Sequence, residues 1–265
     1  MKSLRTSLVQ TSLFWHQPET NRQSLQQKLL PLRNQTDVVI LPEMFTSGFT
    51  TCPEDLANGS HTIDWLSRQA RVLNAAIVGS VATAVDTGAA GKVRYVNRLW
   101  FVPPQGEFFY YDKVHLFRMG NEHRRYQTGQ QRTVVEFRGW RLLLIICYDL
   151  RFPVFCRNRQ DYDAIICVAN WPASRALHWR TLLQARAIEN QSYVLGVNRV
   201  GIDGQNISYI GDSLAVAPRG ELLIDQPGEW VRTVELNGED LCDYRQQFPA
   251  WQDADAFDLH LQPRS

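Results

Sequence analysis

The segment from Leu142 to Pro153 reads LLLIICYDLRFP and indicates the class of fold. Five consecutive aliphatic residues before Cys147 are typical of a buried strand, and the polar and aromatic residues after it end that strand. In α/β folds the chemistry lies at the carboxyl ends of strands, so Cys147 is a candidate nucleophile. The alternative is structural, because free cysteines are among the most buried residue types and commonly act as small hydrophobic side chains.

Two more charged side chains follow short apolar runs. Glu43 comes one proline after the run Val38–Leu41, and Lys113 comes shortly after an aromatic run. Each has a structural alternative: Glu43 could be a solvated loop acid, and Lys113 could pair with Asp112. The same pattern at three strand ends favours one shared site over three unrelated residues.

These three side chains together have the chemistry of an acyl-transfer site. A thiol with a pKa of about 8.5 is mostly protonated at neutral pH, so Cys147 needs a base or a nearby positive charge. Glu43 could take the thiol proton and later pass it to a leaving amine. Lys113 and the backbone N–H of Tyr148 could hold the oxyanion, at about 3–4 kcal/mol for each donor. Such a set suits acyl transfer from an amide or a nitrile.

Apolar runs separated by helical periodicity predict an α/β fold. Turn signals at Pro103–Gly106 and Pro218–Gly220 predict hairpins, so the sheet should be mixed rather than all parallel. Arg186 lies on the apolar stripe of a predicted helix, and we expect it to pair with Glu189. Helices are expected at Asn21–Pro31, Ile63–Leu73 and Ser174–Gln191, and strands at Leu4–Gln10, Val38–Leu41, Ala76–Val81, Arg98–Val102, Glu107–Tyr111, Leu142–Cys147, Ala164–Ala169, Ser192–Val197 and Asp212–Ala217.

The composition excludes several classes of function. A chain of 265 residues that is 44% hydrophobic can bury a sizeable core and is near the upper size for one α/β domain. The net charge of +1 gives no electrostatic reason to expect nucleic acid or a membrane as partner. The five cysteines form no CxxC pair, so neither a disulfide framework nor a metal site is indicated. No segment resembles a signal peptide or a membrane span, and we expect a cytoplasmic protein.

Three segments resemble those of a known family. LPEMF around Glu43, DKVHLF around Lys113 and CYDLRFP from Cys147 resemble the signature segments of the nitrilase superfamily of carbon–nitrogen hydrolases, in the same order and at similar spacing. The resemblance covers nearly the whole chain. The NWP segment at Asn170–Pro172 and the loop Phe117–Gly129 are most similar to those of the bacterial YafV-type ω-amidases.

The resemblance implies a fold and an assembly. The family fold is a four-layer α-β-β-α sandwich with two mixed sheets, and residues 1–265 would form a single domain of this kind. A homodimer is also implied. The segment 237–265 is too apolar for a free tail, and we expect it to pack on the domain or on a second copy.

The resemblance also implies roles for individual residues. Glu43 matches the general base, Lys113 the charge stabiliser and Cys147 the nucleophile that carries a thioester. Glu122 matches a second family glutamate near the lysine, although it could instead be a loop acid paired within His123–Arg125. No metal or organic cofactor is implied.

The implied reaction is hydrolysis of the terminal amide of a small 2-oxo dicarboxylic acid monoamide, such as 2-oxoglutaramate or 2-oxosuccinamate, to the acid and ammonia. An aliphatic nitrilase or an N-carbamoyl amino acid amidohydrolase would use the same three residues, and only the pocket separates these cases. A non-catalytic binding scaffold is disfavoured because all three positions are filled. A nucleotide-binding enzyme is also disfavoured, because Gly88–Lys92 (GAAGK) is too short for a phosphate loop and is predicted to be a polar turn.

The substrate pocket is less well determined by the sequence. Phe49, Phe117, Tyr148 and Trp171 are candidates for its wall, and each could equally be an ordinary core aromatic. An ω-amidase must also hold a carboxylate at the far end of its substrate, which requires a cation. The candidates, among which the sequence does not choose, are Arg118, His123, Arg124, Arg125 and Arg175.

Overall fold

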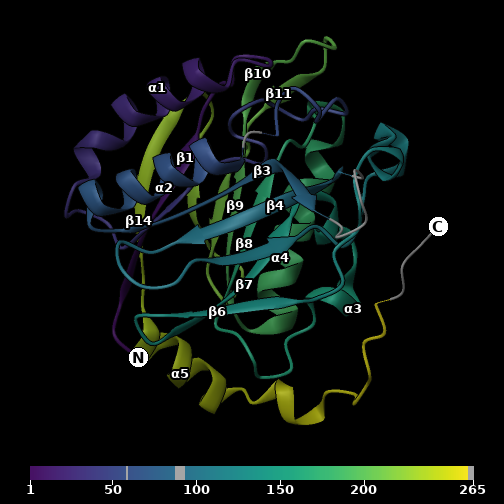
Figure 1. Ribbon diagram of the computed structural model, residues 1–265. Helices are drawn as coiled ribbons and strands as arrows, with labels where there is room; N and C mark the ends of the chain where they lie inside the picture. The colour runs from purple at the N-terminus through teal and green to yellow at the C-terminus, as the bar shows by residue number, and fades with distance from the viewer. Residues whose placement is uncertain (58, 87–92, 262–265) are drawn as a thin grey trace.

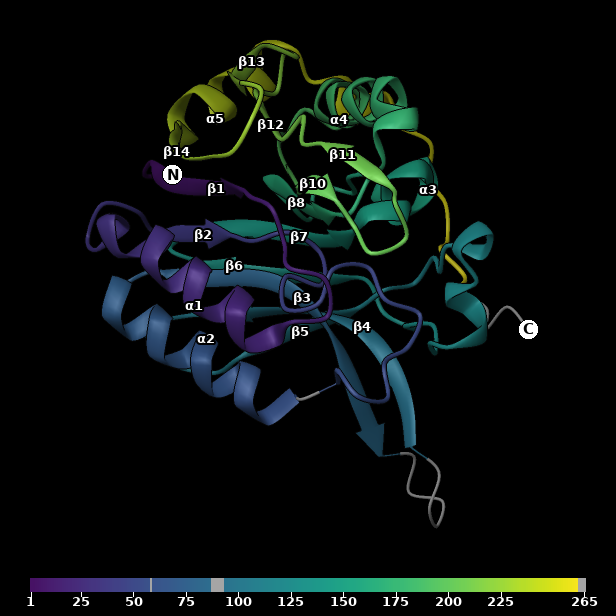
Figure 2. The ribbon, with the colours of Figure 1, turned by 90° about the horizontal axis from the view of Figure 1, so that it is seen from above.

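Two six-stranded sheets lie face to face, and helices cover the outer face of each (Figures 1 and 2). The computed structural model describes residues 1–57, 59–86 and 93–261. The polar turn predicted at Gly88–Lys92 lies outside these residues. The arrangement is the four-layer sandwich with two mixed sheets that the resemblance implies, so the predicted fold class is confirmed.

Six strands form the first sheet, in the spatial order β14 (Trp230–Leu236), β1 (Leu4–Gln10), β2 (Val38–Ile40), β3 (Ala76–Asp86), β4 (Val93–Val102) and β5 (Phe109–Asp112). β1, β2 and β3 run parallel to one another. The other pairings are antiparallel, including the β4–β5 hairpin predicted at Pro103–Gly106.

Six strands also form the second sheet, in the order β13 (Leu222–Asp225), β12 (Leu214–Val216), β9 (Tyr193–Asn198), β8 (Ala164–Ala169), β7 (Trp140–Ile146) and β6 (Thr133–Phe137). β7, β8 and β9 are parallel, and the outer pairings are antiparallel. A separate hairpin of β10 (Val200–Ile202) and β11 (Ser208–Ile210) follows β9.

The two-residue period of the strands divides the apolar side chains between two cores. Val38 and Ile40 of β2 point into the core between the sheets, whereas Val39 between them points to the outer layer of helices. That layer consists of α1 (Pro18–Leu29) and α2 (Gly59–Leu73). Both faces of the first sheet are therefore buried, which explains why its central strands read as continuous apolar runs.

α4 (Ala176–Asn190) covers the outer face of the second sheet. Trp179 and Leu183 pack directly on β9, where a Cβ at Gly196 would lie 2.5 Å from a methyl carbon of Leu183. Glycine is therefore required at this close approach of helix and strand. The short α3 (Pro153–Cys156) follows β7, and α5 (Gly238–Gln247) follows β14. No helix in the described part of the chain is long and apolar enough to cross a membrane.

Several elements differ from the prediction. The sequence did not indicate β6, β10, β11, β14 or α5, and it ended β3 too early and began β4 too late. Only the first and last residues of β14, Trp230 and Leu236, are buried, and β6 is mostly half-buried. Strands at the edge of a sheet need fewer apolar residues, so a search for apolar runs passes over them.

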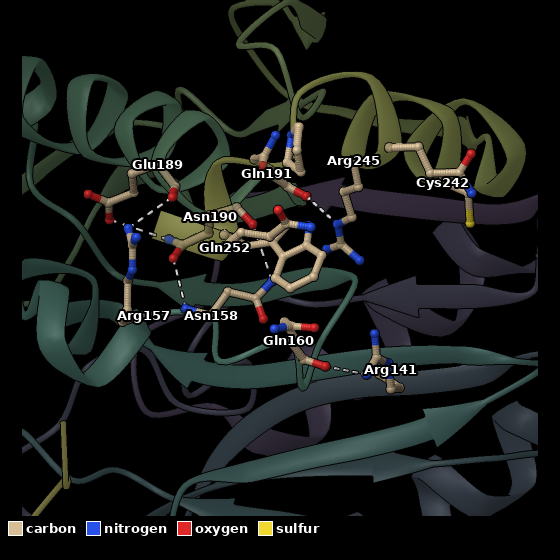
Figure 3. A pocket seen from close by; sticks show the side chains of 13 residues that line it. Arg141, Arg157, Asn158, Gln160, Glu189, Asn190, Gln191, Cys242, Arg245 and Gln252 are labelled. Carbon is tan, nitrogen blue, oxygen red and sulfur yellow. Dashed lines mark hydrogen bonds between the residues drawn. The ribbon is translucent and has the colours of Figure 1, made fainter. Parts of the chain in front are cut away.

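The carboxyl-terminal segment forms one wall of a cavity at the amino-terminal ends of β7, β8 and β9 (Figure 3). This cavity has a volume of about 580 Å³ and is lined by Trp251 and Gln191, among others. Arg141 and Arg245 also line it, and both are paired with Asp163. The residues predicted for catalysis lie at the opposite ends of these strands, so this cavity is separate from the candidate active site.

Candidate active site

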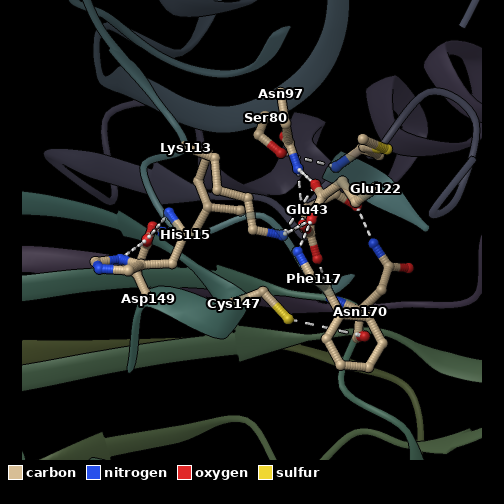
Figure 4. Close-up of polar contacts among 12 residues, drawn as sticks. Glu43, Ser80, Asn97, Lys113, His115, Phe117, Glu122, Cys147, Asp149 and Asn170 are labelled. Carbon is tan, nitrogen blue, oxygen red and sulfur yellow. Dashed lines mark hydrogen bonds and ion pairs between the residues drawn. The ribbon is translucent and has the colours of Figure 1, made fainter. Parts of the chain in front are cut away.

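Glu43, Lys113 and Cys147 meet at the carboxyl ends of strands from the two facing sheets (Figure 4). Glu43 follows β2 and Lys113 follows β5 in the first sheet, while Cys147 follows β7 in the second. Lys113 Nζ lies 2.9 Å from Glu43 Oε1, and all three residues line one cavity of about 500 Å³. The structure therefore brings together the three side chains that the sequence selected separately.

The structural alternatives for the two charged residues do not hold. Glu43 is fully buried, so it is not a solvated loop acid. Asp112 pairs with Arg98, at 2.6 Å from its Nε, and not with Lys113. Lys113 is itself buried and makes its ion pairs with Glu43 and Glu122.

Cys147 lies on a sharp turn. The strand β7 ends at Ile146, one residue earlier than predicted, and Cys147 opens a 3-10 turn that runs to Arg151. Its φ of 47° is in the left-handed region, which a residue other than glycine adopts only at some cost. Apolar periodicity does not reveal such a turn, which lifts the thiol out of the sheet and into the cavity.

One buried carboxylate holds this turn in place. Asp149 Oδ2 accepts hydrogen bonds from the backbone N–H of Ile146 at 2.9 Å and from the Tyr111 hydroxyl at 2.8 Å. Asp149 Oδ1 accepts from the backbone N–H of His115 at 2.9 Å and contacts Nδ1 of the same residue at 2.8 Å. Asp149 thus ties the cysteine turn of the second sheet to the segment around Lys113 in the first.

Replacing Asp149 with alanine should therefore be strongly destabilising. The change leaves several buried donors without an acceptor, at about 1–3 kcal/mol for each, so we expect the free energy of unfolding to fall by about 3–5 kcal/mol. Urea denaturation would measure this. The matched control is Asp225→Ala, which removes the half-exposed partner of Arg180 and should cost less than about 1 kcal/mol. Equal costs for the two variants would contradict the account.

Arg186 of α4 also stabilises this turn. Its Nη1 lies 2.8 Å from Glu189 Oε1, so the predicted ion pair is confirmed. Its Nε and Nη2 both donate to the carbonyl of Leu150, at 3.2 Å and 2.7 Å. The buried guanidinium of α4 therefore holds the turn that carries Cys147 as well as its own helix.

Glu122 is fully buried and forms its ion pair with Lys113, whereas Arg125 of its own loop pairs with Glu54. Its Oε2 lies 3.0 Å from Lys113 Nζ and accepts the backbone N–H of Phe117 at 2.6 Å. Asn97 Nδ2 donates to Oε1 of both acids, at 2.8 Å for Glu43 and 3.1 Å for Glu122. Glu43 Oε2 accepts the backbone N–H of Asn170 at 2.8 Å. One ammonium and three neutral donors thus hold two buried carboxylates.

Burial and charge shift the protonation equilibria of this cluster. Burial alone would lower the pKa of Lys113, but the carboxylates of Glu122 and Glu43 outweigh it and hold that pKa well above its usual value. Burial raises the pKa of Glu122, against the opposing effect of Lys113. Burial, reinforced by the charge of Glu43, also raises the pKa of the Cys147 thiol well above its usual value. Both effects favour the protonated form of the Cys147 thiol in this site.

The predicted wall residues Phe49, Phe117, Tyr148 and Trp171 all line this cavity. Phe117 and Tyr148 pack edge to face, with ring centroids 5.2 Å apart. The opposite wall comes from the β10–β11 hairpin, which the sequence did not indicate. It contributes the side chains of Gln205, Ile207 and Tyr209.

Of the five candidate cations for a substrate carboxylate, only Arg175 lines the cavity. Arg118 and His123 line a different pocket beside the carboxyl-terminal segment, Arg125 pairs with Glu54, and Arg124 is exposed.

A second arginine, which the sequence did not predict, also lines the cavity. Arg151 belongs to the CYDLRFP segment, but the sequence did not mark it as a pocket residue. Its guanidinium lies 4.8 Å from the centre of the Trp171 ring, and its Nη2 lies 3.1 Å from His178 Nδ1. The guanidinium of Arg175 lies 5.4 Å from the Phe117 ring. Within the described part of the chain, neither guanidinium has a carboxylate partner, so both can receive an anion.

Comparison with known proteins agrees with this geometry. The family model for carbon-nitrogen hydrolases matches residues 5–246. The chain is 46% identical over 263 residues to "Omega-amidase YafV" of Escherichia coli, covering 98% of this chain and 100% of that protein. It is 29% identical over 260 residues to "2-oxoglutaramate amidase" of Bacillus subtilis, covering 93% and 96%.

A solved structure is similar to the chain in both sequence and fold. XC1258 from Xanthomonas campestris, described as a CN-hydrolase superfamily protein with an arsenic adduct in the active site, superposes with a TM-score of 0.93. The two chains are 45% identical, and the match covers 98% of this chain and 100% of that one. A family model over most of the chain and a relative at 46% identity over almost its full length together establish that the chain belongs to the carbon–nitrogen hydrolase family of the nitrilase superfamily, whose members are hydrolases of carbon–nitrogen bonds.

Proposed function

We propose that the protein is an ω-amidase that hydrolyses the terminal amide of a small 2-oxo dicarboxylic acid monoamide, such as 2-oxoglutaramate or 2-oxosuccinamate, to the acid and ammonia. The observation that carries the proposal is the cavity in which Cys147, Glu43 and Lys113 meet beside two arginines that have no carboxylate partner among the described residues. The names of the Escherichia coli and Bacillus subtilis relatives support the same substrate class.

Acylation is the first half of the proposed reaction. Glu43 takes the proton of the Cys147 thiol while Sγ attacks the amide carbon, so that a carbon–sulfur bond forms and the carbonyl oxygen becomes an oxyanion. Lys113 Nζ and the backbone N–H of Tyr148 stabilise this oxyanion. When the carbonyl re-forms, the carbon–nitrogen bond breaks, Glu43 gives its proton to the nitrogen, and ammonia leaves. Cys147 then carries a thioester.

Deacylation repeats the same steps with water. Glu43 takes a proton from the water molecule, whose oxygen attacks the thioester carbon. The carbon–sulfur bond breaks as the tetrahedral intermediate collapses, and Sγ regains a proton from Glu43. The acid leaves, and the site returns to its resting state with no external oxidant, reductant or cofactor. Glu122 holds Lys113 throughout and moves no proton in this scheme.

The substrate carboxylate would lie between the two pocket arginines. Arg175 and Arg151 line the cavity and rest on the aromatic rings of Phe117 and Trp171. A guanidinium presents a planar pair of N–H donors that matches a carboxylate. A nitrile or a simple aliphatic amide has no group that uses these cations, which favours the 2-oxo acid amide over an aliphatic nitrile.

Replacing Arg175 with methionine should lower kcat/KM for 2-oxoglutaramate by about 10- to 100-fold, because a hydrogen bond to a charged group contributes about 1.5–3 kcal/mol. The loss should come mainly from KM, and turnover of butyramide, which has no carboxylate, should not change. The control is Arg124→Met, an exposed position outside the cavity, which should keep full activity on both substrates. Equal losses of kcat/KM on the charged and neutral amides would mean that Arg175 does not bind the substrate carboxylate.

A substrate panel tests the function itself. Ammonia release is measured with 2-oxoglutaramate, glutamine, an aliphatic nitrile and an N-carbamoyl amino acid. We expect rapid release from the 2-oxo acid amide alone. Preference for the nitrile or the N-carbamoyl compound would assign the protein to one of those activities, with the same cysteine, glutamate and lysine.

The proposal extends to the assembly. We propose that residues 1–265 form one catalytic domain, that the protein is a cytoplasmic homodimer, and that neither nucleic acid nor a membrane is a partner. In the segment 237–265, Leu259 and Leu261 pack against the core, whereas Phe248 and Trp251 remain exposed. We propose that this segment has both roles, packing on its own domain and contacting the second copy.

A further inference from the structure

We propose that Asn97 is a positioning residue of the active site, which holds Glu43 and Glu122 together against Lys113 and thereby keeps Glu43 ready to accept the proton of Cys147. The inference rests on the proposed function for its activity measurements. It adds a residue outside the cysteine, glutamate and lysine set, and Asn97 does not line the cavity.

The first argument is the geometry of the amide. Asn97 lies in the middle of β4, is fully buried, and points toward the two acids (Figure 4). Its Nδ2 is 2.8 Å from Glu43 Oε1 and 3.1 Å from Glu122 Oε1, so each of its two N–H groups can serve one carboxylate. Its backbone carbonyl also accepts the backbone N–H of Lys113 at 3.0 Å. One residue thus contacts the base, the second acid and the lysine.

The second argument is charge. Two carboxylates share a single ammonium in a buried site, and like charges this close oppose each other's ionisation. A second cation in place of Asn97 would neutralise the pair but would also stabilise the ionised form of Glu43 and so make it a weaker base. A neutral amide stabilises both carboxylates without adding charge. Asparagine therefore fits this position better than lysine, aspartate or an apolar residue.

The third argument is that the arrangement has a cost. Asn97 Oδ1 is buried and has no hydrogen-bond partner within the described part of the chain. Reversing the amide would place this oxygen against the two carboxylates, so the acids fix its orientation. An unsatisfied buried acceptor is uncommon and calls for an explanation, and a residue with a purely structural role could avoid it.

The fourth argument is the direction in which Glu43 is held. Lys113 and Asn97 occupy Glu43 Oε1, and within the described residues Oε2 accepts one hydrogen bond, from the backbone N–H of Asn170. A second lone pair of Oε2 is left for the thiol of Cys147. Without Asn97, the Glu43 side chain loses one of the two contacts that fix Oε1, and this direction is no longer defined.

The test is the pH profile of Asn97→Leu, which keeps the shape of the side chain and removes both donors. All the titratable groups that face the amide remain in place in this variant, namely Glu43, Lys113, Glu122, Tyr126 and Cys147. Loss of the donors makes the ionised acid pair less stable, so we expect the acidic limb of the kcat/KM profile to move to higher pH by about one unit or more. At neutral pH kcat should fall by about 10- to 100-fold while KM changes little.

The matched control is Thr83→Val. Thr83 is buried in β3, lies opposite Val96 across the strand pair, and donates a hydrogen bond to the carbonyl of Val81. Its replacement also removes one buried polar group without changing shape, so it should lower stability and leave the pH profile unchanged. If Asn97→Leu fails to fold, Asn97→Ala also removes both donors and should move the acidic limb in the same direction. An unmoved acidic limb, or a loss confined to KM, would overturn the proposal.

A measurement without substrate separates this inference from the proposed function. The rate at which iodoacetamide alkylates Cys147 is followed against pH by mass spectrometry. Its acidic limb should also move to higher pH in Asn97→Leu, because Glu43, one acid of the same pair, accepts the thiol proton. If the wild type hydrolyses none of the amides and the alkylation profile still shifts, the proposed function fails and the role of Asn97 stands. If the wild type is active and neither profile shifts, the role of Asn97 fails alone.

Discussion

Replacing Cys147 with alanine should abolish ammonia release from 2-oxoglutaramate, with a fall in kcat of about 100,000-fold or more. Both halves of the proposed reaction pass through a carbon–sulfur bond to Cys147, and removing the nucleophile of an acyl-transfer site commonly costs about this much. The fold should survive, because the thiol is a small side chain at the edge of a cavity and its loss costs no more than a few kcal/mol. Circular dichroism and urea denaturation would confirm that the variant is folded.

The matched control uses another cysteine of the same sheet. Cys167 lies in β8, opposite Ile145 in the parallel register with β7, and is completely buried in the core. Cys167→Ala should lower the free energy of unfolding by about 1–2 kcal/mol and leave turnover unchanged. If Cys147→Ala kept near-normal activity, or if both variants lost activity in proportion to their stability, the thiol would be structural.

Replacing Lys113 with methionine should damage both activity and stability. The change leaves the carboxylates of Glu43 and Glu122 buried without their ammonium, and breaking a buried ion pair in this way costs about 3–5 kcal/mol. Loss of the oxyanion donor should lower kcat by about 100- to 1,000-fold, which is the effect of removing one such donor elsewhere. Stopped assays of ammonia release and urea denaturation would measure the two effects.

The loss of stability should also depend on pH. Burial already raises the pKa of Glu122, and removing the opposing charge of Lys113 raises it further. An acid whose pKa is higher in the folded state than in the unfolded state favours folding below its unfolded pKa and loses that contribution as the pH rises. Lys113→Met should therefore be least destabilising near pH 5 and most destabilising near pH 8.

The control for this prediction is Lys28→Met, which removes a partly exposed lysine paired with Glu229. It should cost less than about 1 kcal/mol and should not affect kcat. If the loss of stability in Lys113→Met became smaller as the pH rose, the two acids would not be held by this lysine.

The sequence predicted most of the fold because its central strands are buried on both faces. β7, β8 and β9 appear as largely apolar runs, and the hairpins around Pro103–Gly106 and Pro218–Gly220 carry explicit turn residues. The edge strand β14 and the hairpin β10–β11 were missed because their side chains are largely exposed or half-buried. The stacking of two sheets followed from the resemblance, since a two-residue period cannot distinguish one buried sheet from two.

The candidate site was predictable in part for a related reason. Glu43, Lys113 and Cys147 each end an apolar strand, so their sequence positions already indicate a common edge of the fold. Asn97 lies inside a strand and Asp149 inside a turn, and only the three-dimensional structure shows what they contact. A signal for Asn97 was nevertheless present, because an amide just before the apolar run Leu99–Val102 requires hydrogen-bond partners if it is buried.

The most direct test of the central claim is to find the covalent intermediate. The protein is mixed with 2-oxoglutaramate, quenched in acid during turnover, digested and examined by mass spectrometry. The account predicts that the substrate acyl group is attached to the peptide containing Cys147 as an alkali-labile thioester, and that the adduct is absent in Cys147→Ala. An acyl group on any other residue, or continued ammonia release by Cys147→Ala, would contradict it.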